Sequence, residues 1–242
     1  MRSRRRRDFM QILSRDDVPI KKPNPTWDLV SGKRENPLKL SPFPFYRNTL
    51  IFFRNYDLSY AGSDRQIIKD LSFTVERGDR IALHGENGCG KTTVLKRILH
   101  GLGIAQISAF EENGTCEISS GLKVSYVSQD TSWLRGSIQD LCELKGLDRS
   151  LFSTILRQLG FERSQFDKNI EDYSEGQKKK VLIAASLSEQ ANIYIWDEPL
   201  NYIDIFSRIQ IENLILEYQP TLLFVEHDTR FQEKIANKVI LL

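Results

Sequence analysis

The length, composition and charge of the chain describe one globular domain with an appendage. The chain has 242 residues, of which 40% are hydrophobic and 27% are charged, and its formal net charge is +2. These proportions are those of a domain that buries a single core. No run approaches the roughly 20 apolar residues that a membrane-spanning helix needs, and the arginine-rich start leads into polar residues. We therefore expect a cytoplasmic protein with no membrane-spanning segment.

The cysteines fit a reducing compartment. Cys89, Cys116 and Cys142 are odd in number and widely spaced, unlike the cysteines of a disulfide framework or of a zinc site. We expect all three to be reduced thiols.

The first 48 residues differ from the rest of the chain in charge and composition. They hold 12 Lys or Arg against 5 Asp or Glu, whereas the remaining residues hold 22 against 27. Six of the eight prolines also lie there, without a sustained helical or alternating apolar period. We expect a basic, proline-rich linker or tail over residues 1–48. It is either a solvated tether or an arm that contacts the phosphate backbone of a nucleic acid, and charge alone does not decide.

From residue 50 onward, strand-like and helix-like patterns alternate. Apolar runs that fit strands cover residues 50–58, 67–75, 80–84, 116–119, 123–127, 192–196, 221–225 and 239–242. Helical patterns cover residues 90–102, most of 137–159 and a segment after Ser174. Buried strands separated by helical crossovers predict an α/β fold with a parallel sheet.

A phosphate-binding loop lies between one predicted strand and a helix. Residues 85–92 match the pattern glycine, four residues, glycine, lysine, then serine or threonine. In such a loop Lys91 places its charge on the β- and γ-phosphates and the Thr92 hydroxyl binds Mg²⁺. The nucleotide-binding residues predicted here are Gly85, Glu86, Asn87, Gly88, Cys89, Gly90, Lys91, Thr92 and Thr93. A glycine turn that merely caps a helix is the alternative, and the strand before the loop disfavours it.

Two adjacent carboxylates follow a later apolar run. Asp197 and Glu198 come directly after residues 192–196, where unpartnered charges would be costly. Phosphoryl transfer to water needs a metal ion and an oriented nucleophile, so we expect Asp197 to hold Mg²⁺ and Glu198 to be the general base. The alternative is that the two carboxylates only interact with the dipole of a helix N-terminus. The presence of a phosphate-binding loop in the same chain disfavours this alternative.

A third motif carries a resemblance to a known family. Tyr173-Ser-Glu-Gly-Gln177, upstream of Asp197 and followed by three lysines, resembles the signature sequence of ABC ATPases. The resemblance implies a P-loop NTPase domain of the ABC type over residues 49–242. Such a domain has a RecA-like core, an antiparallel β subdomain and a small helical subdomain, which would cover about residues 131–185. It also implies the hydrolysis of ATP to ADP and phosphate with Mg²⁺.

The signature further implies ATP sites that are shared between two domains. In the family, the positions of Ser174 and Gly176 bind the γ-phosphate held by a second, facing ABC domain, and we count Gln177 with them among the nucleotide-binding residues. Glu175 replaces the first glycine of the commonest signature. This departure adds a negative charge near the phosphate, which bears on the rate of hydrolysis more than on binding.

Four further positions match the family one by one. Gln129 resembles the Q-loop glutamine, which contacts Mg²⁺ and the attacking water, and His227 resembles the switch histidine, which contacts the γ-phosphate. Tyr60 lies where the family places an aromatic ring on adenine, and Asp204 sits in the D-loop position. Their ordinary alternatives are a surface glutamine, a capping histidine, a core tyrosine and an N-cap aspartate. Order and spacing favour the family roles.

Within the family, the stretch from Trp196 to Arg208 and the lysines after Gln177 resemble antibiotic-resistance ABC-F proteins, in particular their second ATP-binding domain. Residues 37–46 resemble the end of the linker before that domain. Those proteins are tandem-domain ATPases that bind the ribosome and protect it from antibiotics. The resemblance implies the ribosome (rRNA) and a second ABC domain as partners, the latter being either a second copy or the N-terminal half of a longer protein.

Two other functions stay open on the sequence. One is the ATP-binding subunit of a membrane transporter, which needs a permease partner. The other is an ATP-binding fragment that does not turn over ATP without its partner domain. The segment from Leu200 to Asp204 and the basic linker favour the ABC-F interpretation.

Overall fold

The fold is that of a computed structural model, described for residues 47–62, 66–106 and 110–242. The chain divides into two units, residues 1–37 and 38–242, and all described residues belong to the second. The first described strand begins at Thr49. The predicted linker over residues 1–48 lies outside the described residues, apart from its last two positions, and stays a prediction.

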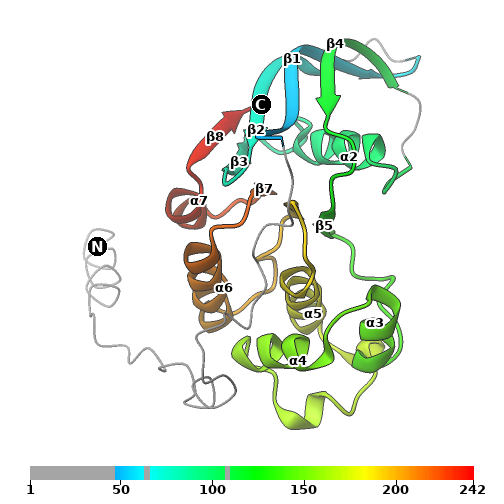
Figure 1. Cartoon of the computed structure of the whole chain (residues 1–242), viewed down its shortest axis with the longest axis vertical. Helices are drawn as coiled ribbons and strands as arrows, with labels where there is room; N and C mark the ends of the chain where they lie inside the picture. Colours follow the sequence, from blue (N-terminus) through cyan, green and yellow to red (C-terminus); the bar gives the residue numbers. More distant parts are fainter. Residues whose placement is uncertain (1–46, 63–65, 107–109) are drawn as a thin grey trace, which may run out of the picture. The chain divides into compact units, whose positions relative to one another are not determined.

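A five-stranded parallel sheet forms the centre of the domain (Figure 1). Its spatial order is β5 (Val124–Val127), β6 (Ile193–Asp197), β7 (Leu222–Val225), β3 (Arg80–His84) and β8 (Lys238–Leu241). Strands β6 and β7 are buried over their whole length, as expected of strands covered on both faces. Because all five strands are parallel, their carboxyl ends meet at one edge of the sheet.

A second sheet is antiparallel and has the order β2-β1-β4. Strand β1 (Thr49–Tyr60) pairs with β2 (Gln66–Glu76) on one side and with β4 (Phe110–Ile118) on the other. The sequence predicted β4 only from residue 116, and this start was wrong. The polar run from Glu111 to Asn113 lies on a mostly exposed edge strand, where the apolar alternation that marks a strand is missing.

One hydrophobic core joins the two sheets to helix α2 (Lys91–Gly101). The helix contributes Val94, Leu95, Ile98 and Leu99, each at most 2% exposed, and the same core contains buried residues of β1, β2, β3, β6 and β7. The apolar face predicted for residues 90–102 is thus confirmed. Packing on both sides of α2 gives the loop that precedes it a rigid base.

A helical part lies between β5 and β6 in the chain (Figure 1). It contains α3 (Ile138–Lys145), α4 (Arg149–Gln158), two short 3₁₀ turns (Arg163–Gln165 and Ile170–Asp172) and α5 (Glu175–Ser188). The helical region predicted at residues 137–159 is two helices, because Gly146 ends α3 with a left-handed φ of 62° and Asp148 caps α4. The second half of α5 is buried at every position from Val181 to Leu187.

Two further helices complete the domain. Helix α6 (Ile205–Tyr218) connects β6 to β7, and α7 (Thr229–Ile235) connects β7 to β8. Within the described ranges, no helix is long and apolar enough to cross a membrane. The α/β class, the antiparallel sheet and the helical part all agree with the predicted fold class.

Candidate active site

The phosphate-binding loop lies between the end of β3 and the start of α2. Gly88 and Gly90 have φ values of 80° and 103°, in the left-handed region that glycine adopts freely. A Cβ atom on Gly90 would also lie 2.5 Å from Ile68 Cδ1. Helix α2 begins at Lys91, so its first unpaired N–H groups and its positive dipole end lie at this loop.

Lys91 is held inside the loop. Its side chain is buried, and its ammonium donates hydrogen bonds of 2.8 Å to the backbone oxygens of both Gly85 and Glu86. Neutral carbonyls are weaker partners for an ammonium than phosphate oxygens are. The charge of Lys91 therefore lies where an incoming phosphate could replace these carbonyls as its partner.

Thr92 and Asp197 meet at the predicted magnesium site. The Thr92 hydroxyl donates to Asp197 Oδ1 at 3.2 Å. Asp197 is 1% exposed, and burial raises its pKa, with the neighbouring charge of Glu198 acting in the same direction. A buried carboxylate whose ionised form is disfavoured fits a site completed by a cation.

The donor set also has the chemistry that Mg²⁺ prefers. Among the described residues no group of three His, Cys, Asp or Glu side chains could hold a metal ion. Mg²⁺ does not need such a cage in a nucleotide site, where one carboxylate and one hydroxyl are completed by phosphates and water. The described residues therefore fit the ion.

Glu198 follows β6 in a strained conformation and is held by three loops. Its φ is 48°, which is uncommon for a residue other than glycine. One carboxylate oxygen accepts from Gln129 Nε2 at 2.8 Å and from Asn201 Nδ2 at 2.7 Å. The other lies 3.2 Å from His227 Nε2. The structure thus brings the predicted Gln129, Glu198 and His227 together and adds Asn201.

We name the three loops by the family terms: the Q-loop (residues 128–132), the D-loop (residues 199–204) and the H-loop (residues 226–228). The buried carboxylate of Glu226 connects two of them. It accepts from the backbone N–H of Leu200 at 3.0 Å and of His227 at 2.7 Å. Loss of this carboxylate would leave two backbone donors of the D-loop and H-loop without their acceptor.

The signature residues form the N-terminus of α5. Ser174 is the N-cap, and it shares a capping box with Gln177, in which each side chain accepts from the other residue's backbone N–H. A Cβ atom on Gly176 would lie 2.4 Å from the backbone oxygen of Tyr202. Only glycine therefore lets α5 approach the D-loop this closely. The predicted nucleotide contacts of Ser174, Gly176 and Gln177 stay predictions.

Glu175, the acidic residue within the signature, has two partners of its own. Glu175 accepts from the Thr131 hydroxyl at 2.5 Å and pairs with Lys178 at 3.0 Å, and the hydrogen bond from Thr131 is the main cause that lowers its pKa. These partners offset the charge that the departure from the commonest signature adds.

Asp204 caps α6 and pairs with Lys180 of α5 at 2.6 Å. Burial acts to raise the pKa of Asp204, but the hydrogen bond from Lys180 and two hydrogen bonds from Ser207 lower it to about 2. The structure thus gives Asp204 the N-cap position that was the ordinary alternative. Its contribution to the nucleotide site stays a prediction.

Tyr60 lies at the end of β1 and is 46% exposed. Its ring centroid is 5.2 Å from that of Phe110, the residue opposite it on β4. This exposure excludes the core alternative and leaves a face of the ring open for stacking. The adenine contact itself stays a prediction.

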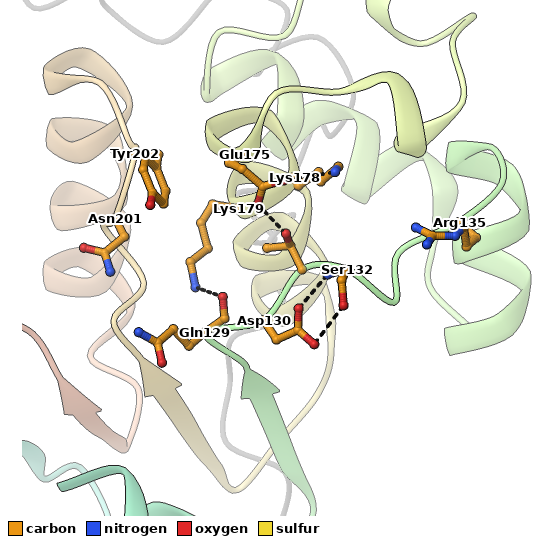
Figure 2. A pocket seen from close by; sticks show the side chains of 10 residues that line it. Gln129, Asp130, Ser132, Arg135, Glu175, Lys178, Lys179, Asn201 and Tyr202 are labelled. Atoms are coloured by element: carbon orange, nitrogen blue, oxygen red, sulfur yellow. Dashed lines mark hydrogen bonds and ion pairs between the residues drawn. The ribbon is translucent and has the colours of Figure 1, made fainter. Parts of the chain in front are cut away.

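A pocket of about 400 Å³ lies beside Glu198, between the Q-loop, the first turns of α5 and the D-loop (Figure 2). Gln129 and Asn201 line it, and both touch the Glu198 carboxylate. Lys179 extends along its wall toward the Q-loop backbone. The pocket therefore lies between the start of α5, which carries the signature, and the residues that contact the predicted general base.

A protein-family model described as "ABC transporter" matches residues 68–201 of the chain. That stretch contains the phosphate-binding loop, the signature and the carboxylate pair. The chain belongs to this ABC family.

Curated relatives refine the assignment of this ABC domain. The chain is 31% identical over 194 residues to "Ribosome protection protein VmlR" of Bacillus subtilis (strain 168), an alignment that covers 79% of this chain and 34% of that protein. It is 33% identical over 201 residues to "ATP-binding protein Uup" of Escherichia coli (strain K12), with 79% and 30% covered. The chain thus spans about a third of the length of these relatives. The predicted resemblance to ABC-F proteins is confirmed.

Solved structures show the same ABC fold. "Structure of ATP binding subunit of ABC transporter" superimposes with a TM-score of 0.64 at 21% identity, over 80% of this chain and 86% of that one. "Structure of a bacterial Atm1-family ABC exporter with ATP bound" gives a TM-score of 0.66 at 19% identity, over 83% and 38%. Likeness at these identities confirms the predicted fold class.

Two residues of this ABC domain carry contacts that the sequence did not predict. Asn201 belongs to the stretch that carries the family resemblance, and the sequence assigns it no role, although it donates to Glu198. Lys179 stands out in the sequence only as part of a basic run, although its ammonium is buried against the Q-loop. A polar residue three positions after the predicted general base was the only available signal for Asn201, and the sequence held none for Lys179.

Proposed function

We propose that this chain hydrolyses ATP as one ABC domain of a paired, ABC-F-type protein that acts on the ribosome. The observation that carries the hydrolytic part is the setting of Glu198. Its carboxylate follows the strand that ends at Asp197 and is held by Gln129, Asn201 and His227. A carboxylate fixed in this way keeps the orientation that a general base needs.

Each residue then has one task when water attacks the γ-phosphate. Lys91 and the amides at the start of α2 bind the phosphates, while Asp197 and Thr92 hold Mg²⁺, which when bound neutralises phosphate charge. Glu198 accepts the proton of the attacking water. Gln129 and His227 orient that carboxylate. The family resemblance further implies that Gln129 contacts the attacking water and that His227 contacts the γ-phosphate.

We further propose that a second ABC domain completes the ATP site. Helix α5 places the signature residues Ser174 and Gly176, and helix α2 places the phosphate-binding loop. The family resemblance assigns the signature and the loop of one domain to different nucleotides. Apolar side chains around the end of the D-loop support a protein contact there: Tyr202 is 79% exposed, Ile205 72% and Phe206 74%. The second domain is either a copy of this chain or part of a longer protein.

The ribosomal part of the proposal rests on the relatives and on charge. One relative is named a ribosome protection protein, and residues 1–48 carry 12 Lys or Arg, which suits a contact with RNA phosphates in the cytoplasm. The transporter alternative has in its favour the description of the family model and fold likeness to solved transporter proteins at 19–21% identity.

Hydrolysis is tested with Glu198→Gln. The wild-type chain is expected to hydrolyse Mg·ATP in the presence of a second ABC domain. The variant should bind ATP within about twofold of wild type and hydrolyse it at least about a hundredfold more slowly, since a general base contributes that much. Glu233→Gln on α7 is the control and should behave as wild type. A Glu198→Gln protein with full activity contradicts the proposed role.

Ribosome binding is tested by sedimentation of the Glu198→Gln protein through a sucrose cushion, as the chain alone and joined to an upstream ABC domain. With ATP, the joined protein is expected to pellet with bacterial ribosomes, and with ADP it should stay in the supernatant. If the amount of joined protein recovered in the pellet with ATP does not depend on added ribosomes, the result would contradict the ribosomal part of the proposal and favour the transporter alternative.

A further inference from the structure

Lys179 connects helix α5 to the Q-loop. Its side chain is 2% exposed, and its ammonium donates to the backbone oxygens of Ser128 at 2.7 Å and of Gln129 at 3.3 Å. Figure 2 shows the side chain reaching from α5 to the Gln129 carbonyl. One lysine therefore holds two consecutive carbonyls of a loop that lies about 50 residues away in the chain.

A lysine is a costly residue to bury here. Desolvation by burial is the main cause that lowers the pKa of Lys179, and the nearby negative charges, chiefly Asp197 and Glu198, act in the opposite direction. An apolar side chain of similar length would fill the same volume without the desolvation cost. Compared with such a side chain, the ammonium adds hydrogen bonds to the Q-loop and a positive charge near the carboxylates of Asp197 and Glu198.

The backbone that Lys179 holds belongs to a residue that touches Glu198. The side chain of Gln129 donates to Glu198 at 2.8 Å, while its main-chain oxygen accepts from Lys179. Without Lys179, the two Q-loop carbonyls lose a charged donor. The Gln129 amide then has less to fix its position relative to the carboxylate.

The same helix begins at the signature. Lys179 lies five residues, about one and a half turns, after Ser174, the N-cap of α5. In the first turn, Gly176 packs against the D-loop, which supplies Asn201 to Glu198. A displacement of the start of α5 would therefore disturb two sets of contacts to Glu198. One set runs through Lys179 and Gln129, and the other runs through the D-loop.

We infer that Lys179 is a positioning residue for ATP hydrolysis, which holds the Q-loop so that Gln129 stays on Glu198 and couples the signature end of α5 to the general base of the same domain. This inference rests on the proposed function. It differs from a purely structural role, because the ammonium serves the placement of Gln129 and not the stability of the fold.

The test compares Lys179→Met with Lys234→Met. Methionine fills the buried space of Lys179 and removes its ammonium, whereas Lys234 pairs with Glu212 away from the site. For Lys179→Met the kcat for Mg·ATP should fall about tenfold, the size of one lost charge-assisted hydrogen bond, with KM within about twofold. Its melting temperature should stay close to that of wild type, since the desolvation cost of the buried charge is removed together with its hydrogen bonds. Lys234→Met should keep its kcat within about twofold.

A parallel fall of melting temperature and kcat in Lys179→Met would show a structural role and overturn the inference, as would an unchanged kcat. Hydrogen exchange in the nucleotide-free chain decides independently of hydrolysis. Amides of residues 127–134 should exchange about tenfold faster in Lys179→Met than in wild type or Lys234→Met, and equal exchange would overturn the inference. If wild type binds but does not hydrolyse ATP, the proposed function fails while this measurement still decides the role of Lys179.

Discussion

At the scale of the residue, charges in the site are fixed by partners that lie both near and far in the sequence. Lys91 is held by two carbonyls of its own loop, and Glu198 by donors from the Q-loop, D-loop and H-loop. The left-handed φ of Glu198 costs on the order of 1 kcal/mol. That strain persists because several hydrogen bonds and the β6 register determine the conformation together.

We expect Lys91→Ala to lose Mg·ATP binding. The substitution removes the compact charge inside the phosphate-binding loop, which no other described side chain of that loop supplies. Binding of a fluorescent ATP analogue by titration is the measurement, with Lys234→Ala as the control, because Lys234 pairs with Glu212 away from the site. Equal affinity of the Lys91→Ala and wild-type proteins would remove the nucleotide from this loop.

Tyr60→Ala should weaken binding of ATP by about five- to tenfold, as expected for the loss of one base–aromatic stack. Because Tyr60 is half exposed at the end of β1, its removal should leave the melting temperature nearly unchanged. Tyr60→Phe keeps the ring and should bind ATP as wild type does. If Tyr60→Ala keeps full affinity, adenine lies elsewhere.

At the scale of the element, the first turns of α5 organise the loops around them. Gly176 packs on the D-loop, Lys179 holds the Q-loop, and Lys180 pairs with Asp204 at the start of α6. The N-terminus of one helix thus contacts two of the three loops that hold Glu198. Displacement of α5 is therefore expected to change the setting of the predicted general base.

The Lys180–Asp204 pair gives a pH-dependent contribution to stability. The pKa of Asp204 is lowered from its model-peptide value of 3.8 to about 2, so the pair stabilises the fold above pH 4, and this stabilisation is lost as the pH falls toward 2. Asp204→Asn keeps the cap and removes the charge. Because Asp204 is 50% exposed, although Lys180 is only 13% exposed, the substitution should cost only about 0.5–1 kcal/mol at pH 7.

The measurement is urea unfolding of wild type, Asp204→Asn and Lys180→Gln between pH 2 and pH 7. The stability difference between wild type and Asp204→Asn should shrink to zero at about pH 2, and it should be smaller throughout in the Lys180→Gln background. A difference that stays constant down to pH 2 would show that Asp204 acts only as a cap.

The sequence predicted elements where a local pattern sufficed. Helix α2 and strand β6 follow from their apolar spacing and from the motifs that flank them, and the phosphate-binding loop follows from its glycines and Lys91. The start of β4 was missed because its polar edge residues carry no alternation. Asn201 and Lys179 were missed because their roles depend on contacts between separate loops, which only the packed structure defines.

At the scale of the whole molecule, the domain carries two half-sites that do not serve the same nucleotide in our proposal. The phosphate-binding loop precedes α2, and the signature precedes α5. In a head-to-tail pair, each ATP would lie between the loop of one domain and the signature of the other. Such a pair is symmetric when both domains are copies of this chain.

Mixing two inactive variants tests this shared site most directly. Lys91→Ala breaks the phosphate-binding loop and Ser174→Arg breaks the signature, so each protein alone should hydrolyse Mg·ATP at the background rate. In a 1:1 mixture, half of randomly formed pairs contain one domain of each kind, and one of their two sites is intact. The mixture should therefore regain about a quarter of the wild-type activity. Full activity of Ser174→Arg alone, or a mixture no more active than its separate components, would contradict an ATP site shared between two copies of this chain.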